Sequence, residues 1–482
     1  MRMPVINTKR LIEWLLPVLF LYSPPVRGQQ IHYSVPLGDN ARSTSFQILG
    51  KCGRAFLIYK SDGRDHDICF YDETMQLTGK QVLDFLPRNL LAIDFVAYPH
   101  QLLAFYQYRR KRTVVCEARI LDASGTPLGK PVLIDETTDN VSLTEEQPYV
   151  LLVSKDKSHL LVYQLRKVED SSMYHLAAFL YDSTLSSVYK KLVTLQSSEL
   201  SDDPSFFKLG NEGDLFFTVG MREHALDAGQ DHVWLYHLGP GKAGSKRYAC
   251  RLNGYASALS QLIETDEQRH CVWLLAWLYD EKQRNIDSLY CLRYDYRRDA
   301  MVSESVSLLD DSLKQAMKGK DYTLRQAFDN TVLKDLVVDK NGNGLLVTED
   351  VHRNVKGKIV SGDLALLELD TAGHLLKGTP VPKYQGDDLL PDLMSYLMIN
   401  TGGSLHFLFN RQYPVARFLS GYIYLVSDYL YKANGSLEEL PLYRNLNKRY
   451  NWVPRDGVQV SSREAIVPCI QGSTLFFAKV TY

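Results

Sequence analysis

The sequence has no surplus of charge of either sign, because 55 lysines and arginines nearly balance 56 aspartates and glutamates. A net charge of −1 provides no overall field that would attract nucleic acid or an acidic membrane surface. Beyond residue 28 the chain contains no apolar run of about 20 residues, the length needed to cross a bilayer. We therefore expect neither a nucleic-acid partner nor a membrane span in that part of the chain.

The motifs of several large enzyme classes are also absent. The sequence contains no G-x-S-x-G, no H-E-x-x-H, no P-loop and no strand-bound G-x-G-x-x-G, which are typical of hydrolases, metalloproteases, nucleotide-binding and dinucleotide-binding proteins. No C-x-x-C pair or His-rich spacing indicates a zinc site. These absences weigh against a catalytic function.

Cysteine is scarce, with seven residues in a chain of 482. An odd number of cysteines in a long chain does not resemble a small disulfide-stapled domain. Most of them lie within apolar runs, where cysteine commonly serves as a small buried hydrophobic residue. We expect buried thiols, although Cys271 and Cys291 could bridge neighbouring strands.

The N-terminal residues have the order of an export signal. A basic region ends at Arg10, the apolar stretch Leu15–Tyr22 follows, and the small residues Val26 and Gly28 precede Gln29. We predict a signal peptide over residues 1–28 that is cut before Gln29, with an uncleaved N-terminal anchor as the alternative. The protein would then act in the periplasm or at the cell surface.

A loose internal repeat dominates the rest of the chain. Thirty tyrosines and eighteen phenylalanines, many of them beside valine, isoleucine or leucine, favour β-strands. Short strand-like runs separated by turns return in the same order about every 50 to 70 residues, a period typical of propellers and solenoids. Seven such units begin near Phe46, Leu91, Pro148, Pro204, Ser257, Val332 and Leu393.

Strands from the two ends of the chain could complete an eighth unit. Strand-like runs begin at Glu464 and Thr474, and a lone one begins at Ile31. A ring in which these terminal strands pair has no open sheet edge between its first and last blades. We predict an all-β fold, a single β-propeller over residues 29–482 with eight blades. Seven blades and two separate β domains are the alternatives.

One segment departs from the strand pattern. Residues 309–328 have Ala, Leu, Lys and Gln at helix-compatible spacing, and Asp310 and Asp311 are placed to favour a helix N-terminus. Gly319 is expected to divide the segment. We predict a short helical insertion on one face of the ring, where it could serve in binding or as a structural plug.

The sequence DKNGNGLLVTED is the clearest candidate for a metal site. The oxygen-bearing residues at its positions 1, 3, 5 and 12 are Asp339, Asn341, Asn343 and Asp350. With Gly344 at position 6, this spacing is close to that of an EF-hand-type calcium loop. The flanks look like strands, however, and Asn-Gly is favoured in two-residue hairpin turns. The pattern therefore indicates either a calcium site or a plain hairpin turn.

Two acidic clusters could supply paired carboxylates. Asp387, Asp388 and Asp392 lie close together, and hydrolysis of a glycan needs two carboxyl groups that flank the scissile bond. The residues Asp65–Asp67 have the residue types of a metal site or a proton relay, with a histidine between two aspartates. Loop carboxylates are more often solvated, and adjacent residues of a turn usually point apart, so catalysis is the less favoured interpretation of both clusters.

Four consecutive basic residues, Arg109–Arg112, fall between two strand-like runs and predict an exposed turn. Such a run could bind phosphate or an acidic polysaccharide, but a solvated hairpin tip is the simpler interpretation. Trp273 and Trp277 lie on one face of a strand that is apolar on both faces. We expect them to be core residues and not a sugar-stacking surface.

Three stretches carry a resemblance to a known group of proteins: Phe95–Tyr108, Ile399–Asn410 and Pro454–Tyr482. Through most of its length after residue 28, the chain resembles uncharacterised exported β-propeller-like proteins of Bacteroidetes-type bacteria. The resemblance implies export and a β-rich fold. It implies no catalytic residues, since none of these stretches is tied to a known reaction.

These features together predict an exported, non-catalytic binding or scaffold protein of the cell envelope. Its partner would be an envelope protein or a glycan that contacts the loop face of the ring. A propeller can also place carboxylates from separate blades around its axis, so a carbohydrate-active enzyme with an axial site is the alternative. Calcium is the one cofactor that the sequence suggests.

Overall fold

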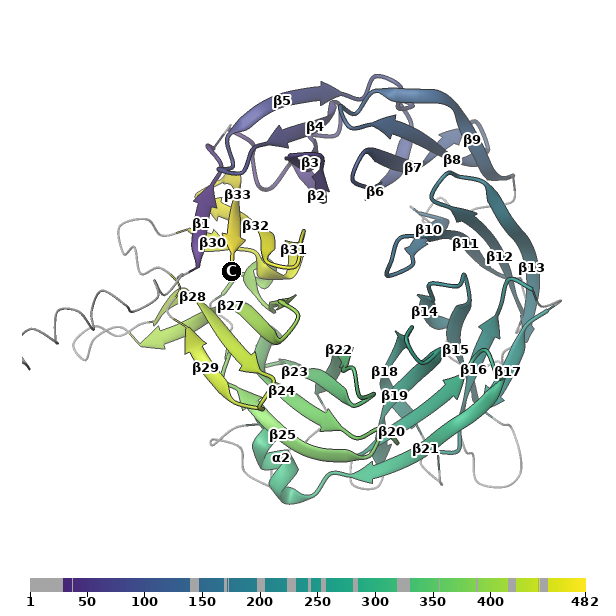
Figure 1. Cartoon of the computed structure of the whole chain (residues 1–482), viewed down its shortest axis with the longest axis vertical. Helices are drawn as coiled ribbons and strands as arrows, with labels where there is room; N and C mark the ends of the chain where they lie inside the picture. Colours follow the sequence, from purple (N-terminus) through teal and green to yellow (C-terminus); the bar gives the residue numbers. More distant parts are fainter. Residues whose placement is uncertain are drawn as a thin grey trace, which may run out of the picture.

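The computed structural model describes residues 29–482 except 37, 139–146, 169–170, 172, 197–203, 223–230, 242–243, 253–256, 281–284, 319–329, 355, 387–388, 415–421, 441 and 443–449. The described residues form an eight-bladed β-propeller, in which eight antiparallel sheets stand around a common axis (Figure 1). The prediction of a single eight-bladed propeller is confirmed. The seven-bladed and two-domain alternatives are wrong.

Seven blades are four-stranded meanders in which each strand pairs with the next one along the chain. Blade 1 consists of β2 (Ser45–Cys52), β3 (Ala55–Ser61), β4 (His66–Tyr71) and β5 (Leu77–Val82). Blade 2 consists of β6 (Leu90–Ala97), β7 (Gln101–Arg110), β8 (Thr113–Asp122) and β9 (Pro127–Thr137). Blade 3 consists of β10 (Tyr149–Val153), β11 (His159–Lys167), β12 (Met173–Asp182) and β13 (Ser187–Gln196). Blade 4 consists of β14 (Ser205–Leu209), β15 (Leu215–Arg222), β16 (Asp231–Leu238) and β17 (Lys246–Ala249).

The remaining blades follow in chain order, and the last one also uses the first strand of the chain. Blade 5 consists of β18 (Ser257–Asp266), β19 (Cys271–Asp280), β20 (Asn285–Asp295) and β21 (Ala300–Leu308). Blade 6 consists of β22 (Thr331–Val338), β23 (Gly344–Arg353), β24 (Ile359–Leu369) and β25 (Leu375–Val381). Blade 7 consists of β26 (Leu397–Asn400), β27 (Ser404–Pro414), β28 (Tyr422–Lys432) and β29 (Leu437–Leu440). Blade 8 consists of β30 (Asn451–Trp452), β31 (Val458–Gln459), β32 (Glu464–Gln471), β33 (Thr474–Thr481) and β1 (Gln30–Tyr33).

The same turn joins the third and fourth strands of blades 1, 2, 3 and 6. It begins at Asp72, Asp122, Asp182 and Asp370. One carboxylate oxygen of each aspartate accepts hydrogen bonds of 2.8–2.9 Å from the amides two and four residues further on. An aspartate that binds the nearby backbone in this way specifies where the chain reverses.

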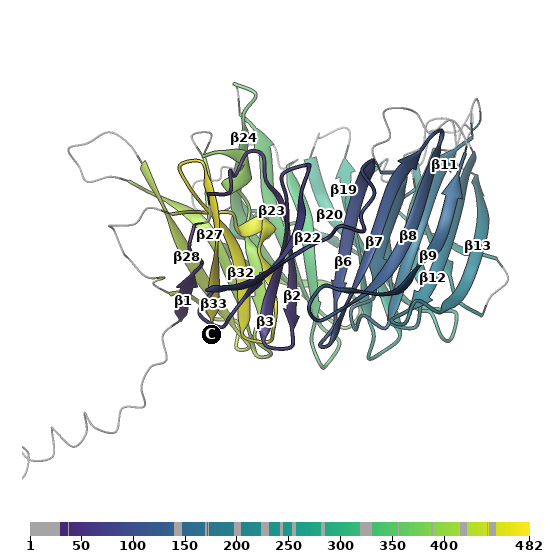
Figure 2. The same ribbon diagram turned by 90° about the horizontal axis from the view of Figure 1, so that it is seen from above.

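Strand direction sorts the loops onto two faces of the ring. Within a blade the first and third strands run one way and the second and fourth run the other, because all pairs are antiparallel. One face, which we call the turn face, carries the turns between first and second and between third and fourth strands. The other, which we call the connection face, carries the turns between second and third strands and the connections between blades. Figure 2 shows the ring edge-on, with the two faces above and below.

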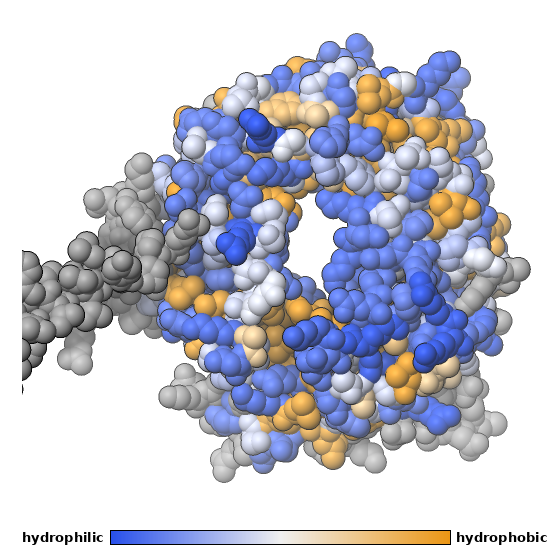
Figure 3. Space-filling model, in the orientation of Figure 1, coloured by the Kyte–Doolittle hydropathy of each residue, from blue (hydrophilic) through white to orange (hydrophobic). Residues whose placement is uncertain are grey.

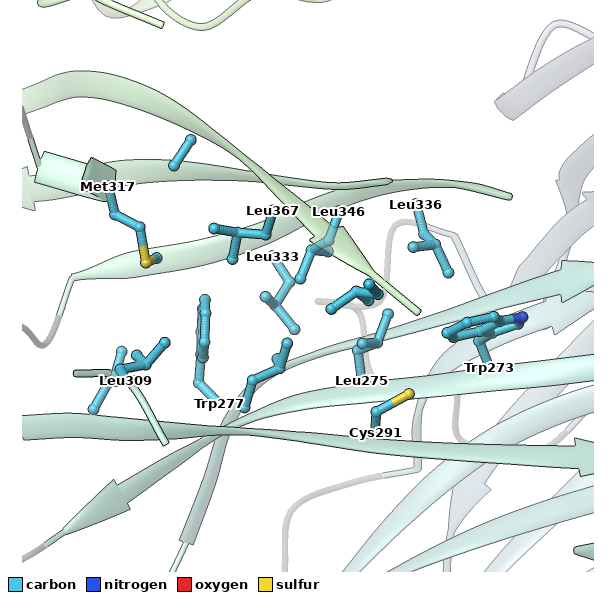
Figure 4. Packing of buried hydrophobic residues seen from close by; sticks show 14 residues of the cluster. Trp273, Leu275, Trp277, Cys291, Leu309, Met317, Leu333, Leu336, Leu346 and Leu367 are labelled. Carbon is cyan, nitrogen blue, oxygen red and sulfur yellow. The ribbon is translucent and has the colours of Figure 1, made fainter. Parts of the chain in front are cut away.

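The hydrophobic core lies between neighbouring blades. The cluster shared by blades 5 and 6 contains Trp273 and Trp277 of β19, Leu333 of β22 and Leu346 of β23 (Figure 4). Both tryptophans are completely buried, so their prediction as core residues is confirmed. Because each blade packs on a neighbour with both of its faces, its central strands are apolar on both faces.

All seven cysteines are buried and free. The prediction of buried thiols is confirmed. Cys271 lies opposite Asp295, and Cys291 lies opposite Leu275, so these two cysteines are not cross-strand neighbours and form no bridge.

The two ends of the chain close the ring. β1 pairs antiparallel with β33 as the outermost strand of blade 8, and Ile31 lies opposite Val480. This is the pairing by which we expected the ring to close. At the same seam, Lys479 of blade 8 donates a hydrogen bond of 2.7 Å to Glu73 of blade 1. The backbone pairing within blade 8 and the partly buried ion pair between blades 8 and 1 therefore both hold the ring closed.

A short helix, α2 (Asp311–Lys318), lies in the connection between blades 5 and 6. Asp310 precedes it and accepts a hydrogen bond of 2.8 Å from the Leu313 amide, which caps the helix N-terminus. Met317 packs into the core cluster shared by these blades. The predicted helix is confirmed, but it packs against β24 and β25 at the outer rim of blade 6 and not over a face of the ring as we expected (Figure 1). Gly319 lies outside the described residues. In the part of the chain that the structure describes, no helix has the length and apolar character needed to span a membrane.

Candidate functional site on the connection face

The connection between blades 6 and 7 is the best-defined candidate for a functional site. Residues 382–396, which we call the crossing segment, run from β25, the outermost strand of blade 6, to β26, the innermost strand of blade 7. The segment includes the short helix η1 (Pro391–Leu393). It lies on the connection face because it joins the fourth strand of one blade to the first strand of the next.

A buried ion pair anchors the crossing segment. The Lys383 ammonium lies 2.9 Å from the carboxylate of Glu349 in β23, and both side chains are almost completely buried. Lys383 also donates to the Ser361 hydroxyl of β24 and, at 3.0 Å, to the Gln385 side chain. An ammonium group has three protons to donate, and here three acceptors take them. Lys383 is therefore fully engaged in holding the segment to blade 6.

Glu349 is the centre of this network. Its Oε1 accepts hydrogen bonds from Ser361, at 2.7 Å, and from Lys383. Its Oε2 lies 3.1 Å from both Ser395 Oγ and Lys334 Nζ. Burial by itself would raise the pKa of Glu349, but the ammonium groups of Lys383 and Lys334 lower it to about 2. Burial also lowers the pKa of Lys383, against the attraction of Glu349.

Further hydrogen bonds fix the backbone of the crossing segment. Asp363 of β24 accepts bonds of 2.8 and 3.1 Å from the amides of Lys383 and Tyr384. The Gln385 side-chain amide donates a bond of 2.9 Å to the carbonyl of Asn410 in β27. The segment is thus held against blade 6 and blade 7 at once, which fixes its position relative to both.

Two residues of the crossing segment have a left-handed backbone. The φ angle is 24° at Tyr384 and 72° at Ser395. Residues other than glycine seldom adopt positive φ, and bulky ones least of all. Such strain persists only where the surrounding contacts over-determine the conformation, and it is concentrated in ligand-binding and switch regions. The backbone therefore marks this segment as a candidate for function.

The outer side of the crossing segment is exposed and partly apolar. The side chains of Tyr384 and Leu390 are 53% and 65% exposed. Further along the segment, Arg455 of η2 (Pro454–Asp456) donates a hydrogen bond of 2.8 Å to Asp392. The exposed groups of the segment and of η2 thus include an aromatic ring and an arginine, which are the residue types enriched where partners dock.

The site contains one pair with the chemistry of a nucleophile and its base. A hydroxyl beside a lysine of lowered pKa, as at Ser361 and Lys383, can be activated for attack. Both residues are almost completely buried, and Lys383 is committed to Glu349. In the described part of the chain this pair is positioned for anchoring and not for contact with a substrate.

The ring axis was the alternative place for a catalytic carboxylate. Figure 3 shows an opening along the axis with mostly hydrophilic residues on one side of it. On β18, the innermost strand of blade 5, Glu264 lies 2.7 Å from Lys208 of β14 and 3.8 Å from Lys155. This carboxylate is neutralised by lysines of the two preceding blades, which ties the inner strands together.

The acidic clusters predicted from the sequence are only partly described. Asp387 and Asp388 belong to the crossing segment but lie outside the described residues. Asp392 is exposed and pairs with Arg455, as described above.

The residues Asp65–Asp67 do not converge on one site. His66 contacts the Tyr59 hydroxyl at 2.7 Å, while Asp67 forms an ion pair of 2.7 Å with Lys80. Burial lowers the pKa of His66.

The four residues of the calcium hypothesis do not form one loop. Asp339 begins a tight turn between β22 and β23, and its Oδ1 accepts bonds of 2.7 and 2.9 Å from the amides of Asn341 and Asn343. Asp350 lies opposite Thr331, at the other end of the hairpin. Because an extended strand rises about 3.3 Å per residue, roughly 20 Å of strand separates Asp350 from the turn. The structure therefore shows the hairpin-turn alternative. Among the residues it describes, no three or more His, Cys, Asp or Glu side chains are grouped to hold a metal ion.

Glu349 and Lys383 were not predicted from the sequence, although a signal for Glu349 exists. In several blades a polar residue interrupts the apolar second strand near its end. Gln107 of β7 bonds both backbone groups of Tyr149, at the start of blade 3, at 2.8 and 3.1 Å. Asn410 of β27 donates bonds of 2.8 Å to two backbone carbonyls, one of them in the crossing segment. Polar residues at this position hold the connections between blades, and Glu349 is one of them.

Comparison with known proteins gives only distant structural similarity. No protein-family model and no functionally characterised sequence matches the chain. Among solved structures, the polysaccharide lyase Uly1 is similar at 10% identity and a TM-score of 0.41, over 81% of this chain and 89% of that one. A prolyl oligopeptidase B from Galerina marginata is similar at 9% identity and a TM-score of 0.39, over 89% of this chain and 55% of that one. A Synechocystis apocarotenoid oxygenase mutant is similar at 8% identity and a TM-score of 0.31, over 68% of this chain and 72% of that one. Similarity at this level carries no argument about the fold or the activity of this chain.

Proposed function

We propose that the protein is exported and acts as a binding or scaffold protein of the cell envelope, engaging an envelope protein or glycan through the crossing segment. The observation that carries this proposal is the buried pair of Glu349 and Lys383, which holds the exposed side chains of Tyr384 and Leu390 on a fixed base. A surface that is fixed before binding loses little conformational entropy on association. The order of basic, apolar and small residues before Gln29 supports export.

The same contacts support binding better than catalysis. A general acid or base needs a pKa near the working pH, whereas the pKa of Glu349 is lowered to about 2 and its oxygens face four donors. Asp392 is paired with Arg455. The carboxylates described in and beneath the crossing segment thus have structural partners.

The test is capture of partners from an envelope extract by the immobilised mature protein, run beside a screen against assorted polysaccharides. Two variants with the same chemical change are compared. Leu390→Ser alters the crossing segment, and Leu308→Ser alters a side chain that is 70% exposed on the outermost strand of blade 5. We expect a reproducible partner that L390S and Tyr384→Ser both lose and that L308S retains.

Two results would overturn the proposal. A partner that L390S and Y384S bind as well as the unaltered protein would exclude the crossing segment as the docking surface. Turnover of a glycan that disappears in Asp387→Asn or Asp388→Asn would instead assign an enzyme to the same segment.

A further inference from the structure

A second region of the connection face has the composition of a ligand site. The turn between β7 and β8 in blade 2 is formed by the basic run Arg109–Arg112, in which Arg110 lies opposite Thr113. A hollow of about 460 Å³ adjoins this turn and is lined by the residues from Arg110 to Thr113. A sequence pattern that predicted only an exposed turn therefore coincides with a concave surface.

The charge of this turn is largely unneutralised in the described part of the chain. Arg110 forms an ion pair of 2.7 Å with Glu136. Arg109, Lys111 and Arg112 have no carboxylate partner among the described residues, and Lys111 and Arg112 are exposed. Of these cations, Arg110, Lys111 and Arg112 line the hollow, so an anion placed in it is attracted by all three.

The backbone of the turn is strained in a way that its sequence does not relieve. The φ angle at Lys111 is 58°, in the left-handed region that favours glycine. Two-residue hairpin turns normally place glycine or asparagine at such a position. Here Lys111 and Arg112 occupy the two turn positions. The turn therefore carries two positive charges at positions where the residues that fit its backbone best are uncharged.

An aromatic row runs alongside the basic turn. The rings of Phe85 and Tyr106 are 5.9 Å apart, and those of Tyr106 and Tyr108 are 6.3 Å apart and stacked. Residues two apart in a strand point to the same face, so Tyr108 and Arg110 project from one side of β7. Tyr106 is buried, whereas Tyr108 is partly exposed and ends the row next to the turn.

We propose that this hollow binds an acidic polysaccharide. Guanidinium groups bind carboxylate or sulfate groups in a bidentate manner, and Lys111 supplies a further positive charge. Tyr108 is not among the residues that line the hollow, but it projects from the same side of β7 as Arg110, and its partly exposed ring offers a polymer that extends along this strand an apolar face against which a sugar ring packs. The spread of cations along the turn exceeds what a single small anion needs, whereas a polymer with repeated charges uses all of them.

This site lies in blade 2 and shares no residue with the crossing segment. The proposed function does not specify which glycan is bound, whereas this site specifies an acidic polysaccharide. The two proposals are tested independently. A variant that abolishes binding at one of these two sites gives no result for the other, which is tested with its own variants.

The experiment measures retardation of the mature protein in native gels that contain polygalacturonate, dextran sulfate or neutral dextran. The double variant Lys111→Gly/Arg112→Ser removes two charges and places glycine at the left-handed position, so folding is preserved or improved. Its control is Lys356→Ser/Lys358→Ser, which removes two exposed charges from the turn between β23 and β24 on the same face. We expect retardation by the acidic polymers but not by dextran, and about a tenfold weaker affinity in K111G/R112S with less than a twofold change in the control.

A second comparison separates sugar recognition from attraction to any polyanion. Tyr108→Ser should weaken binding of polygalacturonate and leave binding of inorganic polyphosphate unchanged. Absence of retardation, equal losses in K111G/R112S and in K356S/K358S, or tighter binding of a polynucleotide than of either acidic polysaccharide would each overturn the proposal.

Discussion

The buried pair beneath the crossing segment permits a prediction with a definite order of effects. In Glu349→Leu, the Lys383 ammonium stays buried with only two uncharged acceptors, Ser361 and Gln385. Removing one partner of a buried pair costs about 3–5 kcal/mol, because the other charge is left uncompensated. In Lys383→Met, Glu349 keeps three of its donors, including the partly exposed Lys334. We therefore expect Glu349→Leu to lower the free energy of unfolding by about 4 kcal/mol and Lys383→Met by about half as much.

The double variant Glu349→Leu/Lys383→Met tests the reasoning most directly. Replacing both charges by apolar side chains of similar size is often neutral, so the double variant should be more stable than Glu349→Leu alone. Urea unfolding followed by tryptophan fluorescence suits the purpose, because Trp273 and Trp277 lie in the core beside blade 6. Glu368→Gln is the control: its contact of 3.9 Å with Lys377 is a surface pair worth less than about 1 kcal/mol, and the glutamine oxygen still accepts the hydrogen bond of 2.8 Å that Tyr431 donates to Glu368.

Additive losses would refute this account. If the double variant lost as much free energy as the two single variants combined, the two charges would not depend on each other. If Glu349→Leu lost no more than Glu368→Gln, the pair would not stabilise the crossing segment.

Four further predictions follow from the seam, the buried carboxylate and the termini. The pKa of Glu349 is about 2 in the folded protein, against an ordinary value of 4.5. Ionisation of this group therefore contributes about 3 kcal/mol to the free energy of unfolding, which is present above pH 4.5 and is lost as the pH falls towards 2. In acid unfolding, the stability of Glu349→Gln should depend less on pH between these two values. Deleting residues 29–40 removes β1 and should lower the free energy of unfolding by about 2–4 kcal/mol with a less cooperative urea transition, and an unchanged transition would contradict closure by this strand. Intact-mass measurement of the natively produced protein should give a chain that begins at Gln29, whereas a soluble cytoplasmic form that retains Met1 would exclude export. Titration with millimolar calcium should leave the melting temperature unchanged, since Asp350 lies at the opposite end of its hairpin from Asp339; a rise that Asp339→Asn abolishes would restore the calcium hypothesis.

The blades could be predicted because short-range rules determine them. Alternating and continuous apolar runs specify strands, and turn residues such as Asp122 specify where the chain reverses. The closure by Ile31 followed from a spare strand at each end of the chain. These features depend on neighbours in the sequence, or on counting strands, and need no knowledge of side-chain contacts.

The candidate site could not be predicted in the same way. Glu349 and Lys383 lie on different elements and meet only after blade 6 has formed and the connection to blade 7 has crossed it. The spacing from Asp339 to Asp350 suggested a calcium site because calcium ligands at this spacing belong to a loop that curls back on itself. The residues after Gly344 form an extended strand instead, which carries Asp350 away from the turn. Neither fact is contained in local composition.

The closure of the ring also sets the time at which the molecule is complete. The backbone amide of Phe477 donates a hydrogen bond to the Ser34 hydroxyl within the terminal seam, and these residues are 443 positions apart in the chain. At roughly 5–20 residues per second, a ribosome needs tens of seconds to produce the second partner after the first has emerged. During that interval β1 has no strand to pair with, and any chain that stops short of β33 leaves an unpaired strand edge open to other molecules. The length of the chain, and not the stability of any single blade, therefore determines the earliest moment at which this protein is closed.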